Sequence, residues 1–177
     1  RETELAEALA GRVIAAGDVV LYEALPFCAG YNAELMVTVA VDEVSPAQHR
    51  TASACGTILT ELVRRLGPGT STGPLAAFGR ELFAESGLPG PTHALGHFLG
   101  IDNYEGPPLD GPTVLEPGMV ITLHPNLVVP GGPRAIAHGT YLITERGAEA
   151  LSASPGRGLY RAEDVLASSG FASEGAA

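Results

Sequence analysis

Two of the chain's five histidines, His93 and His97, lie four residues apart in the segment THALGHFLGIDNYEGPP, residues 92–108. A glycine precedes the second histidine, and a Tyr-Glu-Gly-Pro-Pro turn ends the segment. An imidazole can bind a metal, transfer a proton near neutral pH, or lie buried with its nitrogens hydrogen-bonded. The pair alone leaves these roles open.

Helices and strands elsewhere in the chain must position this segment. Apolar residues recur on one face between glycine and proline breaks, and Ser45 followed by Pro46 is typical of a helix start. We expect helices over residues 2–15, 46–66 and 73–86. Short runs rich in β-branched residues, bounded by turns, indicate strands. We expect strands over residues 18–25, 31–41, 119–129 and 138–145, of which the first two form a hairpin and the third is interrupted by Pro125.

The length and the order of these elements predict one domain. A chain of 177 residues is long enough for one full hydrophobic core. Helices in the first half, with strands spread along the chain, favour an α+β domain with a largely antiparallel sheet. We expect this domain to cover residues 1–166, followed by a frayed tail over residues 167–177, which is small and polar.

The composition excludes several classes of protein. Hydrophobic residues make up 45% of the chain and charged residues 17%, as in folded globular proteins. The net charge of −10 argues against a nucleic-acid partner, because phosphates repel an acidic surface. No apolar run is long enough to cross a bilayer, and residues 1–16 carry acids, unlike a secretory leader. We expect a cytoplasmic protein with Cys28 and Cys55 as reduced, buried thiols.

Five blocks of sequence carry a more specific signal. They are GDVV at residues 17–20, GY at 30–31, HALGHFLGIDNYEGP at 93–107, LEPGMV at 115–120 and TLHP at 122–125. Together they resemble the pita-bread metalloenzymes, the family of creatinase, aminopeptidase P, Xaa-Pro dipeptidase and methionine aminopeptidase. The resemblance covers about residues 2–152. It implies a pita-bread fold, a homodimer, and two divalent metals held by two aspartates, one histidine and two glutamates.

Carried over one position at a time, the family's five metal ligands fall on Glu23, Glu34, His97, His124 and His138. Only His97 keeps the family's residue type, because glutamates replace the aspartates and histidines replace the glutamates. Every replacement is itself a metal ligand, so we expect a metal site. The two glutamates carry a formal charge of −2, against −4 in the family, which favours one ion over a pair. We expect one or two divalent ions per chain, drawn from Fe, Mn, Co and Zn.

Three further residues are expected to act beside the metal. His93 matches a family histidine that helps to orient substrate and move protons, so we expect a catalytic role for it. Tyr104 stands where the family has a second such histidine, and a phenol is a poor general base near pH 7. Arg134 is expected to contact a substrate carboxylate.

These residues agree with three functions. The first is a metal-dependent hydrolase that cleaves a C–N bond of a small amide, a short peptide or a guanidino compound. The second is a mononuclear metalloenzyme with non-hydrolytic chemistry, such as an Fe(II) oxygenase or a lyase, favoured by the three histidines and by Tyr104. The third is a peptide-binding module without catalysis, against which the exchange of ligands for other ligands argues. We expect the first.

Overall fold

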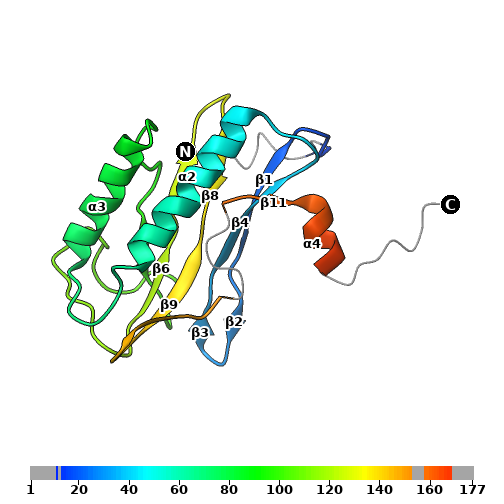
Figure 1. Ribbon diagram of the computed structural model, residues 1–177. Coiled ribbons are helices and arrows are strands. Elements are labelled where there is room, and N and C mark those ends of the chain that lie inside the picture. The colour runs from blue at the N-terminus through cyan, green and yellow to red at the C-terminus, as the bar shows by residue number, and fades with distance from the viewer. Residues whose placement is uncertain (1–10, 12, 153–157, 169–177) are drawn as a thin grey trace.

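The computed structural model describes residues 11, 13–152 and 158–168 (Figure 1). Its helices are α2 (Pro46–Val63), α3 (Thr72–Glu85) and α4 (Ala162–Ser168). Its strands are β1 (Val19–Ala24), β2 (Phe27–Cys28), β3 (Tyr31–Asn32), β4 (Leu35–Ala40), β5 (Gly96–Phe98), β6 (Val120–Leu123), β7 (Asn126–Val128), β8 (Arg134–Ile136), β9 (Gly139–Thr144), β10 (Gly147–Ala150) and β11 (Tyr160–Arg161). They form sheets in the orders β1-β4-β11, β10-β9-β6-β5, β2-β3 and β7-β8. Only the pairing of β11 with β4 is parallel among the pairings described, so the expected α+β class is confirmed.

The predicted N-terminal hairpin is present, with one difference. Strands β1 and β4 pair antiparallel, from Val19 opposite Ala40 to Ala24 opposite Leu35. The strand expected over residues 31–41 is divided into β3 and β4, and β3 pairs with β2 in a smaller hairpin. Glu34 lies in the break, directly before β4, and not inside a strand.

The two long helices follow their local sequence signals. Ser45 caps α2, because its hydroxyl oxygen accepts a hydrogen bond of 3.1 Å from the Gln48 amide. Helix α2 ends three residues before the expected position, and α3 is shifted by one residue. No helix in the described ranges is long and apolar enough to cross a bilayer.

Two expectations concern the ends of the chain. Most of the helix expected over residues 2–15 lies outside the described residues, and residues 13–15 are not helical. Helix α4 continues to Ser168, so the first two residues of the expected tail are helical. Residues 169–177 lie outside the described part.

Helices α2 and α3 lie side by side and cover one face of the strands (Figure 1). The core beneath them contains fully buried side chains from both helices and from β6 and β9, among them Ile58, Leu59, Leu62, Phe83, Ile121, Leu123 and Ile143. Side chains alternate along a strand, so Thr122, between Ile121 and Leu123, faces away from the helices. That opposite face leads to the functional site.

The two cysteines differ in exposure. Cys55 on α2 is 0% exposed, as expected, but Cys28 at the tip of the small hairpin is exposed, so the expectation of a buried Cys28 was wrong. Burial raises the pKa of the Cys55 thiol to about 12.

We predict that an aromatic disulfide reagent reacts quickly with one thiol in the folded chain and with both in denaturant. Cys28→Ser should abolish the fast reaction. Fast reaction of both thiols in the folded protein would contradict the burial of Cys55.

Candidate metal centre

Strand pairing places the histidines on one face of the four-stranded sheet. His97 on β5 lies opposite Thr122 on β6, and Thr122 lies opposite Thr140 on β9. Directly opposite residues of antiparallel strands share a face, as do residues two apart in one strand. His124 follows Thr122 by two residues, and His138 precedes Thr140 by two. A backbone hydrogen bond of 2.8 Å from the His124 amide to the Leu95 carbonyl extends the pairing to His124.

Threonine hydroxyl groups tie the N-terminal hairpin to this face. The Thr140 hydroxyl donates to the Glu34 carbonyl oxygen at 3.3 Å. The Thr38 hydroxyl donates to the Ile136 carbonyl at 2.9 Å and accepts from the Ile136 amide at 2.8 Å. These contacts hold the start of β4 against β8 and β9. They leave the Glu34 side chain buried, with the residue 3% exposed.

Glu34, His97 and His124 converge on one point. One ligand atom from each lies within 4.8 Å of the others, and all three residues are buried. Glu34 Oε2 is 3.1 Å from His97 Nε2, and the ring centroids of His97 and His124 are 5.2 Å apart. Within the described part of the chain, neither oxygen of the Glu34 carboxylate makes a well-directed hydrogen bond, and neither does Nε2 of His97 or His124.

Buried ligand atoms without a well-directed hydrogen bond are costly, even where they lie 3.1 Å apart as Glu34 Oε2 and His97 Nε2 do. A buried carboxylate and buried ring nitrogens lose their hydration on folding, and each unsatisfied group costs about 1–3 kcal/mol. A divalent cation between them would satisfy all three side chains at once, and carboxylate oxygen and imidazole nitrogen are ordinary ligands of such ions. The residues present therefore fit a metal ion.

The protonation of Glu34 and His124 also suits metal binding, whereas His97 must lose a proton that the Glu34 carboxylate favours. Burial lowers the pKa of His124 to about 4, so this imidazole is neutral at pH 7. Burial raises the pKa of Glu34, but the neighbouring His138 and His97 lower it further, to about 2, so the carboxylate is ionised. For His97, burial lowers the pKa and Glu34 raises it, with a net rise. His97 Nδ1 lies 3.0 Å from the Phe98 carbonyl and donates to it, which directs Nε2 toward Glu34.

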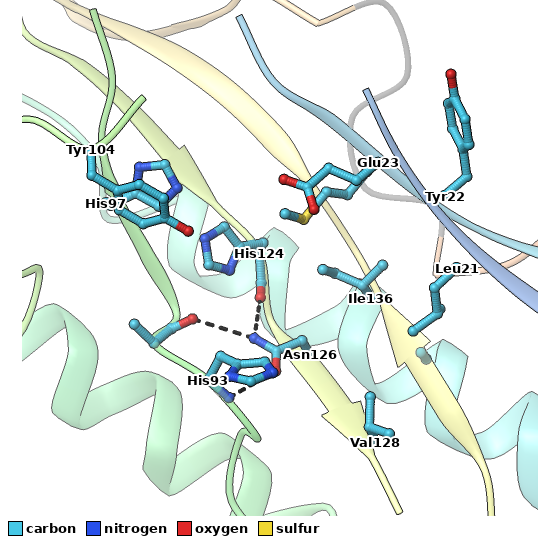
Figure 2. A pocket seen from close by; sticks show the side chains of 13 residues that line it. Leu21, Tyr22, Glu23, His93, His97, Tyr104, His124, Asn126, Val128 and Ile136 are labelled. Carbon is cyan, nitrogen blue, oxygen red and sulfur yellow. Dashed lines mark hydrogen bonds between the residues drawn. The ribbon is translucent and has the colours of Figure 1, made fainter. Parts of the chain in front are cut away.

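The other two expected ligands lie beside this group. His138 Nε2 shares a hydrogen bond of 2.8 Å with the Thr122 hydroxyl and lies 3.5 Å from Glu34 Oε1. Glu23 on β1 is exposed, and its side chain points across the pocket toward His124 (Figure 2). Neither residue belongs to the group of three. The structure thus brings three of the five expected ligands together and places the other two next to them.

A pocket opens beside the group. His93, His97, His124, Tyr104 and Glu23 give it a polar side (Figure 2), and Leu21, Met36, Val128 and Ile136 give it an apolar side. The Tyr104 ring packs against His97 with centroids 3.9 Å apart, although the residue is 69% exposed. The expected catalytic residues His93 and Tyr104 therefore both lie at the pocket.

Arg134 lies elsewhere. It borders a separate hollow with Gly17, Asp18 and Gln48. Its backbone amide donates to the Gln48 side chain at 3.0 Å, and its carbonyl accepts from the same side chain. Contact between Arg134 and a substrate carboxylate stays a prediction, and this position does not favour it.

Asn126, at the start of β7, was not expected to take part in the site. It is 4% exposed, and its amide makes three hydrogen bonds (Figure 2). Oδ1 accepts from the His93 amide at 3.0 Å, and Nδ2 donates to the carbonyls of His124 at 2.9 Å and Ala94 at 3.3 Å. The only signal in the sequence was a polar residue within the apolar run MVITLHPNLVV. Asn126 joins the backbone of His93 to that of His124.

We predict that Asn126→Ala weakens both the fold and ion binding. The change leaves the carbonyl of the buried His124 without its side-chain partner, at about 1–3 kcal/mol, and loosens the His124 backbone. Loss of such a supporting contact lowers metal affinity about 10–100-fold. Urea unfolding and ion titration measure the two effects. Asn32→Ala, which removes a side-chain bond of 2.6 Å to the Ile101 carbonyl outside the pocket, should lower stability alone. Unchanged ion affinity in a folded Asn126→Ala protein would contradict the positioning role.

Comparison with known proteins gives a consistent set of matches. A family model described as "Metallopeptidase family M24" matches residues 4–167. The chain is 31% identical over 141 residues to the Xaa-Pro dipeptidase of Pyrococcus furiosus, a match that covers 77% of this chain and 40% of that protein. It is 28% identical over 156 residues to the creatinase of a Bacillus species, covering 81% of this chain and 38% of that protein.

Solved structures agree with these sequence matches. The prolidase from Pyrococcus horikoshii OT3 is similar with a TM-score of 0.79 and 26% sequence identity, over 84% of this chain and 44% of that chain. The prolidase from Pyrococcus furiosus is similar with a TM-score of 0.76 and 29% identity, over 80% of this chain and 43% of that chain. The chain spans about two fifths of the length of the curated relatives reported above.

Proposed function

Because the chain belongs to metallopeptidase family M24, we propose that it is a metal-dependent hydrolase that cleaves a C–N bond of a small amide, a short peptide or a guanidino compound. The pita-bread fold expected from the sequence is confirmed by the solved relatives. The observation that carries the proposal is the buried group of Glu34, His97 and His124, with unpaired ligand atoms beside a pocket.

The three side chains of this group would hold a divalent ion, which polarises a substrate carbonyl and activates a water molecule when bound. Glu34 brings the negative charge to the group. His97 is oriented by the Phe98 carbonyl, and the main chain of His124 is held by the Leu95 carbonyl and by the side-chain amide of Asn126. The site is thus partly preorganised, because the His97 ring and the main chain of His124 are both held before anything binds.

His93 and Tyr104 would handle the substrate. His93 lies on the exposed wall of the pocket, and its backbone is anchored by Asn126. An imidazole at this place can pass a proton to the leaving nitrogen. The Tyr104 hydroxyl points into the pocket (Figure 2) and can donate a hydrogen bond to a substrate oxygen.

The pocket lining indicates the kind of substrate. Leu21, Met36, Val128 and Ile136 offer an apolar wall for a side chain next to the scissile bond. No lysine or arginine is among the described residues that line the pocket. We propose a small molecule or a short peptide with an apolar group near the cleaved bond. The expected homodimer stays a prediction.

The ligand set favours a second candidate function. Two imidazoles and one carboxylate are also the ligands of non-haem Fe(II) oxygenases. The exposed Tyr104, in place of a histidine, is consistent with chemistry that needs no second base. This candidate predicts oxygen consumption with Fe²⁺ and no reaction with Zn²⁺.

An anaerobic assay separates the candidates. Metal-free protein is loaded with Zn²⁺, Co²⁺ or Mn²⁺ and given Xaa-Pro dipeptides, longer Xaa-Pro peptides and creatine. We expect hydrolysis that needs the ion, is lost in His97→Ala and persists in His49→Ala, a change of an exposed histidine on α2. Oxygen uptake in a parallel aerobic assay with Fe²⁺, without hydrolysis in the anaerobic assay, would support the second candidate. A chain that binds no ion and shows neither reaction would leave a peptide-binding module.

A further inference from the structure

We propose that Glu34, His97 and His124 form a single-ion site, so that this chain holds one divalent ion where the family it resembles holds two. The inference rests on the metal binding of the proposed function and is independent of hydrolysis. According to this proposal, Glu23 and His138 are not metal ligands.

The convergence of ligand atoms supports one ion. Across the residues that the structure describes, Glu34, His97 and His124 are the only group of three or more ligand-type side chains whose ligand atoms lie within 4.8 Å of one another. A carboxylate and two imidazoles surround a single point. A second ion would need its own set of ligands, and of the five expected ligands only Glu23 and His138 remain outside the group of three.

His138 occupies the other side of the Glu34 carboxylate. Oε2 of Glu34 faces His97 at 3.1 Å, while Oε1 faces His138 at 3.5 Å. His138 Nε2 also shares a hydrogen bond of 2.8 Å with the Thr122 hydroxyl. A carboxylate that bridges two cations turns one oxygen toward each. Here a ring nitrogen, anchored by Thr122, stands at the second oxygen in place of a second cation.

The charge of the site also favours one ion over two. Glu34 alone offers −1, and Glu23 would bring the total to −2. One divalent ion at +2 is nearly neutralised by these groups, whereas two ions at +4 are not. Ions in two-metal sites lie about 3.5–4 Å apart, and their repulsion in a buried site is large unless carboxylates offset it.

The ligand types indicate the class of ion. Sites rich in imidazole suit Zn²⁺, Co²⁺, Ni²⁺ and Fe²⁺, while Mn²⁺ and Mg²⁺ prefer sites made of oxygen ligands. Two histidines and one glutamate, with a position open to the pocket, are the ligands of many catalytic zinc sites. We therefore expect Zn²⁺ or Co²⁺ to bind more tightly than Mn²⁺, by at least about tenfold.

The count of bound ions tests the proposal. Metal-free protein is dialysed against excess Zn²⁺ or Co²⁺ and analysed by elemental analysis and titration calorimetry. We expect one ion per chain in the unmodified protein, and one in Glu23→Gln and His138→Gln. His97→Ala and His124→Ala should bind none at ion concentrations that saturate the unmodified chain. His49→Ala, the matched control, should bind one.

Several results would overturn the inference. Two ions per chain, with the second lost in Glu23→Gln or His138→Gln, would show a paired site. No bound ion, or Mn²⁺ bound as tightly as Zn²⁺, would refute the assigned ligand set. The count on the unmodified protein decides the matter even if a variant fails to fold. One bound ion without hydrolysis would refute the hydrolase function and support the single-ion site. Two bound ions with hydrolysis would refute the single-ion site and support the hydrolase function.

Discussion

Glu34→Gln is expected to lower the affinity for Zn²⁺ by at least about 100-fold. Glu34 provides the only carboxylate of the three-residue group and is 3% exposed. A four-ligand zinc site is worth about 10–16 kcal/mol, so one ligand contributes roughly 3 kcal/mol, or about 100-fold in affinity. Glutamine keeps the shape of the side chain but removes its charge, so the loss is electrostatic and not one of packing.

Thermal unfolding gives an independent readout of this prediction. An ion that binds only the folded chain stabilises it by about 2.7 kcal/mol at 100 times its Kd. At the same concentration, added Zn²⁺ should stabilise Glu34→Gln by no more than about 0.4 kcal/mol, so its Tm should rise far less than that of the unmodified protein. Glu149→Gln, at an exposed position on β10, serves as the control and should behave like the unmodified protein. An undiminished Zn²⁺ affinity in Glu34→Gln would show that Glu34 is not a ligand of the ion.

Gly96→Ala is expected to destabilise the protein by about 3 kcal/mol, the upper range for overpacking of a core. A Cβ at Gly96 would overlap the Thr122 carbonyl oxygen and lie 3.1 Å from the Leu123 Cα. Both atoms belong to the backbone of β6, which pairs with Gly96 through Leu123. The backbone cannot move aside without opening the pairing of β5 and β6. Because His97 is the next residue, ion affinity should fall as well.

A second glycine in the same region serves as the control. A Cβ at Gly90 would have nothing within 4 Å, and its φ is not in the left-handed region. Gly90→Ala should therefore change the free energy of unfolding by no more than about 0.5 kcal/mol, as at ordinary surface positions. Urea unfolding compares the two variants. Equal stability of both would mean that β5 and β6 are not as closely packed as the structure shows.

These contacts explain why two histidines stand so close together beside a glycine. His97 faces the three-residue group from β5, while His93 lies on the pocket wall with its backbone held by Asn126. Gly96 between them lets β5 approach the Thr122 carbonyl closely. The spacing thus places one imidazole in the site and the other beside it.

Local signals in the sequence predicted the long elements well. The Ser45 cap and the apolar period of α2 act within a few residues, so this helix was placed at its start and within three residues of its end. Strand β5 was missed, because three residues with a glycine and a histidine show no alternation. It exists through its pairing with β6, which is distant in the sequence.

Three of the five expected metal ligands converge in the structure, but the sequence did not reveal their geometry. Position-by-position resemblance led to Glu34, His97 and His124, which converge in the structure. The separation of His138 from this group depends on the pairing of β6 with β9 and on the Thr122 hydroxyl, which no local pattern reveals. Asn126 was missed for the same reason, since two of its three partners, His93 and Ala94, lie more than 30 residues earlier in the chain.

The measurement that tests the metal centre most directly is anomalous diffraction at the zinc absorption edge, from crystals of the protein loaded with Zn²⁺. We predict one peak per chain, in contact with Glu34, His97 and His124 at about 2.0–2.2 Å. A strong zinc peak elsewhere, or a Glu34 carboxylate with no peak beside it, would contradict the assignment of this centre.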